Sequence, residues 1–267
     1  MKKVKLLGIL ALSAVVLGAC SSVPSQSGAN SDKTEQTDKK EESVKEKVTK
    51  DAETLLDAVL TTDIAKFKKI YGETYDKWTE AVFAVQTSEK VKDDGLTPAS
   101  TYSVQWHADF PIETPEETIT GFLKVRRKMF QEIGSYSIKD VKLDESGSSA
   151  TVTFTSKKLH SKGLAASTRD VLTTLIGGID NLGKYNTAGS NVDIKRYQTL
   201  ISYWIFEHLF RHDFTIYNDV DPNLAYTPFT TGDFDTEIKL TKDKEGNWLI
   251  SQEDYRTLAT ELIDNTE

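Results

Sequence analysis

The chain contains a single cysteine, Cys20, among its 267 residues. One cysteine cannot form an internal disulfide, so the folded part of the chain must depend on a hydrophobic core. Residues 51–267 are long enough for one large domain or two small ones. The spacing of apolar residues is therefore the main guide to the fold.

The first nineteen residues have the features of a signal peptide. Lys2, Lys3 and Lys5 precede an apolar run, Leu6–Leu17. This run is shorter than the roughly 20 apolar residues that cross a bilayer, and it has the length of a signal-peptide core. Small residues follow it, so we predict a cleaved signal peptide over residues 1–19.

The end of this segment, Leu17-Gly18-Ala19-Cys20, resembles the lipobox of bacterial lipoproteins. The resemblance implies that cleavage occurs before Cys20 and that its sulfur carries a diacylglyceryl group built from fatty acids such as palmitate. Two acyl chains give stable anchoring. We therefore expect a protein anchored on the extracytoplasmic face of a cell membrane, most simply that of a Gram-positive bacterium. A further possibility is that the released peptide itself is active, since Leu12–Ala19 is similar in composition to apolar mating pheromones.

Residues 20–50 are polar, and the six lysines between Ser21 and Lys50 balance six acidic residues. Such a composition cannot bury enough apolar surface to offset the entropy of ordering. We expect a flexible tether here, whose last part is already helical from Val44 onward, and an extracellular domain over residues 51–267. The chain has a net charge of −8, which becomes −11 without the three signal-peptide lysines. This acidity argues against binding to nucleic acid or to anionic lipid.

The clearest helix signal is Thr114-Pro115-Glu116-Glu117, which places a capping residue, a proline and an acid in the order typical of a helix start. Residues with helical spacing follow: Ile119, Phe122, Leu123, Arg126, Met129, Phe130 and Ile133. Earlier helices are expected around Leu55–Leu60 and Tyr75–Val85. Residues 163–212 return to helical spacing, with a break at Gly177-Gly178.

Two segments have the period of two that is typical of strands. Residues 136–156 form one expected hairpin, with a slip near Asp140, and residues 234–250 form a second, followed by a helix capped near Ser251. We predict an α+β fold in which both hairpins join one curved antiparallel sheet covered by helices, with a helical insertion at about 163–230. The segments Tyr136–Ser156 and Phe234–Ile250 resemble the NTF2-like and cystatin-like folds found in lipoproteins of Gram-positive bacteria.

Two candidate sites fall in the last helix of the insertion. Its aromatic residues, above all Tyr203 and Trp204, either line a ligand pocket or belong to the core. His208 and His212 are four residues apart, so one face of the helix could present both to a metal ion. Leu209 occupies the position of the glutamate in the zinc metalloprotease motif, and a third ligand would have to come from elsewhere, such as Glu207, His107 or Asp109.

Other catalytic signatures are weak. Trp106-His107-Ala108-Asp109 could supply a general base, but no nucleophile motif accompanies it. The mature sequence has no G-x-S-x-G, S-x-x-K, P-loop or G-x-G-x-x-G motif. We predict a non-enzymatic surface lipoprotein without a cofactor, which binds a small ligand or a protein partner. The alternative is a metal-assisted hydrolase that uses His208 and His212.

Overall fold

The structure is a computed structural model that describes residues 31–98, 101–105, 111–210 and 229–265. The expected signal peptide, Cys20 and the first part of the expected tether lie outside the described residues. The chain divides into two units, Met1–Lys40 and Glu41–Glu267, and the fold described below is that of the second unit.

The two predicted hairpins are present and share one sheet. Its antiparallel strands are β1 (Tyr136–Leu143), β2 (Ser149–Ser156), β4 (Phe234–Lys242) and β5 (Trp248–Leu249), in the spatial order β1-β2-β4-β5. The register slips between Ile138 and Asp140, where the sequence predicted an irregularity. A second, two-stranded parallel sheet joins β3 (Leu159–His160) to β6 (Ile263–Asp264).

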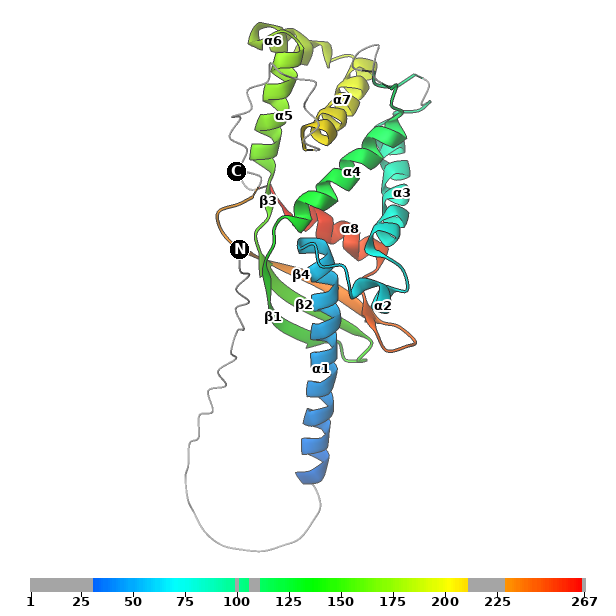
Figure 1. The fold of residues 1–267 in the computed structure, drawn as a ribbon, viewed down its shortest axis with the longest axis vertical. Coiled ribbons are helices and arrows are strands. Elements are labelled where there is room, and N and C mark those ends of the chain that lie inside the picture. The colour runs from blue at the N-terminus through cyan, green and yellow to red at the C-terminus, as the bar shows by residue number, and fades with distance from the viewer. Residues whose placement is uncertain (1–30, 99–100, 106–110, 211–228, 266–267) are drawn as a thin grey trace, which may run out of the picture. The chain divides into compact units, whose positions relative to one another are not determined.

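The helices are α1 (Ser31–Leu60), α2 (Phe67–Tyr71), α3 (Tyr75–Asp93), α4 (Pro115–Gln131), α5 (Ser161–Leu175), α6 (Ile179–Ala188), α7 (Val192–Phe210) and α8 (Gln252–Glu261). The predicted α+β class is therefore confirmed (Figure 1). Three helices, α5 to α7, stand between β3 and β4, where the sequence predicted a helical insertion. Gly177 and Gly178, both with positive φ, separate α5 from α6.

One face of the sheet is buried and the other is polar. Ala150, Val152 and Phe154 of β2 are buried, while the threonines between them are partly exposed. Thr153 and Thr155 donate hydrogen bonds to Glu237 and Asp235 of β4. This alternation is what an antiparallel sheet with one covered face requires. The buried face forms a first core with α1, α2, part of α4 and α8.

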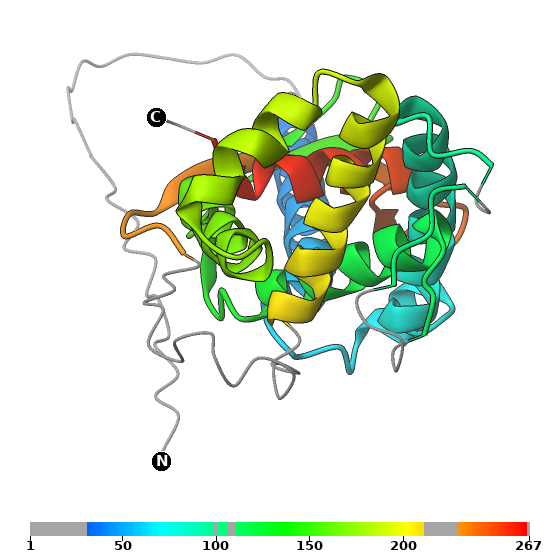
Figure 2. The same ribbon diagram turned by 90° about the horizontal axis from the view of Figure 1, so that it is seen from above.

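A second core lies within the helical part of the fold. It includes Ile119 and Leu123 of α4, Val171 of α5, and Leu200 and Ile205 of α7. Seen from above, α5, α7, α4 and α3 follow one another as a layer (Figure 2). The insertion is thus packed against the opening helices through a core of its own.

The first helix begins earlier in the chain than the expected helical start at Val44. Helix α1 begins at Ser31, and Val48 is fully buried in the first core. Asp51 is 4% exposed, and its carboxylate accepts a hydrogen bond of 2.9 Å from the backbone N–H of Trp248. Ion pairs one helical turn apart, such as Glu41–Lys45 at 2.9 Å, support the polar part of the helix. The polar composition of this segment predicted disorder. Composition does not reveal these contacts, because they depend on residue spacing within the helix and on packing against the sheet.

Candidate functional site

A cavity of about 560 Å³ opens between α3, α4, α7 and α8. We call it the Arg126 cavity; the side chains used below are Lys90, Phe122, Arg126, Tyr203, Glu253 and Arg256. Its volume falls in the range of small-molecule sites. Two of the four helices come from the first half of the sequence, one from the insertion and one from the C-terminal part, so only the folded chain creates this space.

Aromatic rings line one side of the cavity. The ring centroids of Phe122 and Tyr203 are 5.0 Å apart. The Tyr203 hydroxyl donates a hydrogen bond of 3.3 Å to Asp94, and Lys90 lies 4.9 Å from the centre of the Tyr203 ring. Burial raises the pKa of Tyr203, so its hydroxyl remains a donor at neutral pH. These contacts fix the position of the Tyr203 ring.

The cations of the cavity differ in their partners. Arg256 pairs with Glu89 at 2.5 Å, and Lys90 pairs with Asp94 at 3.2 Å. Arg126 packs on aromatic rings instead, with its guanidinium carbon 5.3 Å from the centre of Phe122. Within the described part of the chain, no carboxylate forms an ion pair with Arg126. The Arg126 side chain is partly buried, and this burial lowers the pKa of its guanidinium.

A partly buried guanidinium without an anionic partner loses hydration that no ion pair offsets. A carboxylate can accept two parallel hydrogen bonds from the coplanar N–H groups of a guanidinium. The Arg126 cavity is therefore suited to a small molecule that carries one carboxylate beside an apolar or aromatic group.

The structure separates the two aromatic residues that the sequence singled out. Tyr203 is partly buried and lines the Arg126 cavity. Trp204 is 4% exposed and belongs to the second core, where its ring centroid lies 4.2 Å from that of His208. Trp204 thus has a packing role, and only Tyr203 has access to a ligand in the cavity.

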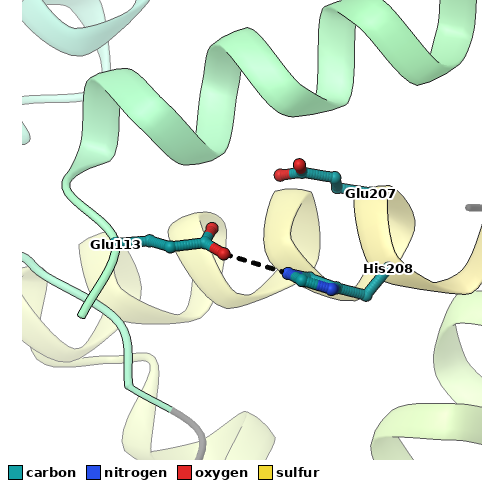
Figure 3. A group of neighbouring side chains, drawn as sticks. All are labelled: Glu113, Glu207 and His208. Carbon is teal, nitrogen blue, oxygen red and sulfur yellow. Dashed lines mark hydrogen bonds and ion pairs between the residues drawn. The ribbon is translucent and has the colours of Figure 1, made fainter. Parts of the chain in front are cut away.

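The expected metal ligands lie partly outside the described residues, which include neither His212 nor His107 nor Asp109. His208 lies beside Glu113, with its Nε2 atom 3.2 Å from a carboxylate oxygen (Figure 3). Glu207 is near both, and one ligand atom from each of the three side chains lies within 4.8 Å of the others. Glu207 was an expected third ligand, whereas Glu113 was not predicted.

Two residues of interest were missed by sequence reasoning. Arg126 carries a detectable signal, because it is a charged residue at an apolar position of the predicted helix. Glu113 has none: it lies 95 residues from His208 in the sequence, and the packing of α4 against α7 brings them together.

Comparisons with known proteins do not assign a family. No protein-family model and no curated protein matches the chain. Among solved structures, the chain is similar to ycdA of Bacillus subtilis, provisionally described as a lipoprotein, with a TM-score of 0.48 and 18% sequence identity. The similarity covers 88% of this chain and 60% of that one. The NTF2-like and cystatin-like resemblance thus stays a prediction.

Among the described residues, no helix has both the length and the apolar character needed to cross a membrane.

Proposed function

We propose that the protein is a non-enzymatic binding module, anchored to a membrane through lipid on Cys20, which holds a small carboxylate-bearing molecule in the Arg126 cavity. The observation that carries this proposal is the partly buried Arg126 guanidinium, which lines the cavity without a carboxylate partner among the described residues. The lipobox resemblance at Leu17–Cys20 supports the anchor.

The charges around the cavity favour a single negative charge on the ligand. Asp93 and Glu253 also line the cavity, and both are exposed. They repel a dianion more strongly than a monoanion, and the net charge of −8 adds a long-range repulsion of polyanions. A ligand with one carboxylate satisfies Arg126 with the least repulsion from these acids.

Benzoate is a suitable probe because it joins one carboxylate to an aromatic ring, which Phe122 and Tyr203 can contact. We expect saturable binding to the purified chain with a dissociation constant of about 1 mM, as is reasonable for so small a ligand. Arg126→Met should weaken it at least about tenfold, the loss of one charge-assisted hydrogen-bonding group. Titration followed by NMR measures both constants.

Lys128→Met is the matched control, since Lys128 is an exposed cation on the same helix. It should leave benzoate binding unchanged. Equal binding by Arg126→Met, or no saturable binding by the unmodified chain, would contradict the proposal. Tighter binding of inorganic phosphate than of benzoate would contradict the choice of a monocarboxylate.

The alternative function, a metal-assisted hydrolase that uses His208 and His212, stays a prediction, because His212 lies outside the described residues.

A further inference from the structure

The cluster of Glu113, Glu207 and His208 is separate from the Arg126 cavity, and none of its members lines that cavity. Glu113 directly precedes the capping residue of α4, while Glu207 and His208 are consecutive residues of α7. Figure 3 shows the three side chains directed toward one region between the two helices. All three are buried or nearly so: Glu207 is 2% exposed, and the side chains of His208 and Glu113 are 15% and 18% exposed.

Neighbouring contacts hold Glu113 and His208 in place. The second carboxylate oxygen of Glu113 accepts a hydrogen bond of 3.3 Å from Thr118, and its backbone exchanges two hydrogen bonds with Val104. The His208 ring packs on Trp204. Outer contacts of this kind orient the ligands of metal sites.

Space for the Glu207 carboxylate comes from Gly121 of α4. A Cβ atom on Gly121 would lie only 1.9 Å from a Glu207 carboxylate oxygen. A glycine inside a helix lowers the stability of that helix by about 1 kcal/mol relative to alanine. Gly121 therefore weakens α4 at the position where the helix accommodates the buried Glu207 carboxylate. Glu113 and Glu207 thus place carboxylate oxygens close to the His208 ring in a space largely screened from water.

We propose that Glu113, Glu207 and His208 bind one Zn²⁺ ion. Imidazole nitrogen and carboxylate oxygen are both zinc ligands, with bond lengths of about 2.0–2.2 Å. Two such ligands on a tetrahedral ion lie about 3.3 Å apart by that geometry, close to the 3.2 Å between His208 and Glu113. Side-chain rotation of Glu207 closes the remaining distance, which is at most 4.8 Å. The ion neutralises two carboxylates, and the histidine disfavours Ca²⁺ and Mg²⁺.

The test is calorimetric titration of the purified, metal-free chain with Zn²⁺. We expect one ion per chain, a dissociation constant below about 10 µM and a rise in melting temperature on loading. His208→Ala and Glu113→Gln should each weaken binding at least about tenfold, in the range reported for loss of a ligand contact or its support. Glu113→Gln keeps the shape of a partly exposed side chain, so a fold defect does not obscure the result.

His160→Ala is the matched control, because His160 is partly buried but distant in sequence from the cluster. It should leave zinc binding unchanged. Absence of stoichiometric zinc binding by the unmodified chain would overturn the site. So would a loss of binding in His212→Ala with none in Glu113→Gln, since that result assigns the ion to the histidine pair expected from spacing alone. Benzoate binding is unaffected by either outcome, which keeps the two proposals distinguishable.

Discussion

At the scale of single residues, the surroundings of a glycine decide whether its replacement by alanine stabilises or destabilises the protein. Gly121 and Gly183 both stand inside helices without positive φ, where glycine normally weakens the helix. A Cβ on Gly183 would meet nothing within 4 Å, whereas one on Gly121 would collide with the buried Glu207 carboxylate. The same substitution therefore has opposite effects at the two positions.

We expect Gly183→Ala to stabilise the protein by about 0.5–1 kcal/mol, because the helix gains propensity at no steric cost. Gly121→Ala should destabilise it by about 1 kcal/mol or more, because the buried Glu207 carboxylate must move away from the added methyl group. Urea unfolding of both variants measures these changes. Stabilisation by Gly121→Ala would show that Glu207 does not occupy this space.

At the scale of elements, α4 shows how local sequence sets a helix start. The Thr114 hydroxyl accepts a hydrogen bond from the Glu117 N–H at 3.2 Å, and the Glu117 carboxylate accepts one from the Thr114 N–H at 2.8 Å. This is the predicted capping arrangement. The bonds from the Thr114 backbone and hydroxyl lower the pKa of Glu117 below its ordinary value of 4.5.

The lowered pKa predicts a pH-dependent contribution to stability. Because the folded state favours the ionised carboxylate, the contribution is complete above the unfolded pKa and is lost as pH falls through the lower, folded value. Glu117→Gln should therefore reduce the free energy of unfolding by about 0.5 kcal/mol at pH 7, a small value because the group is exposed. At pH 3 the difference in stability between the two proteins should be smaller than at pH 7.

Urea unfolding at both pH values is the measurement. Glu116→Gln is the control, since Glu116 is an exposed acid in the same helical turn outside the capping box. Its effect should vary less with pH. An equal effect of Glu117→Gln at pH 7 and pH 3 would show that the charge of Glu117 has no part in the cap.

At the scale of the whole molecule, the expected lipid site and the folded unit are separate parts of the chain. Cys20 precedes the unit Glu41–Glu267, which contains no cysteine. That unit is held together by its two cores and needs no contribution from the thiol.

Cys20→Ala is thus expected to abolish lipid attachment and normal processing without altering the fold. Cells labelled with radioactive palmitate should show no labelled protein, while the melting temperature of the purified variant should match that of the unmodified folded unit. Ser21→Ala, the adjacent substitution, should retain the label. Normal labelling of Cys20→Ala would refute the lipobox assignment.

The sequence by itself determined the elements whose signals are local. The Thr114 cap, the break at Gly177-Gly178, the slip near Asp140 and the two hairpins each depend on neighbouring residues, and all are present in the structure. The alternation of apolar and polar residues also predicted that the two hairpins share one sheet. Each hairpin has one apolar face that must be buried, and in a single sheet the same helices can cover both apolar faces.

Only the tertiary structure decided which side chains meet. Helix packing joins Glu113 to His208, leaves Arg126 without a carboxylate among the described residues and draws α1 into the core at Val48. The histidine spacing predicted His212 as a neighbour of His208, and His212 lies outside the described residues; the fold places Glu113 beside His208. Contacts between residues far apart in sequence depend on the relative placement of whole helices, and residue spacing within one helix carries no information about that placement.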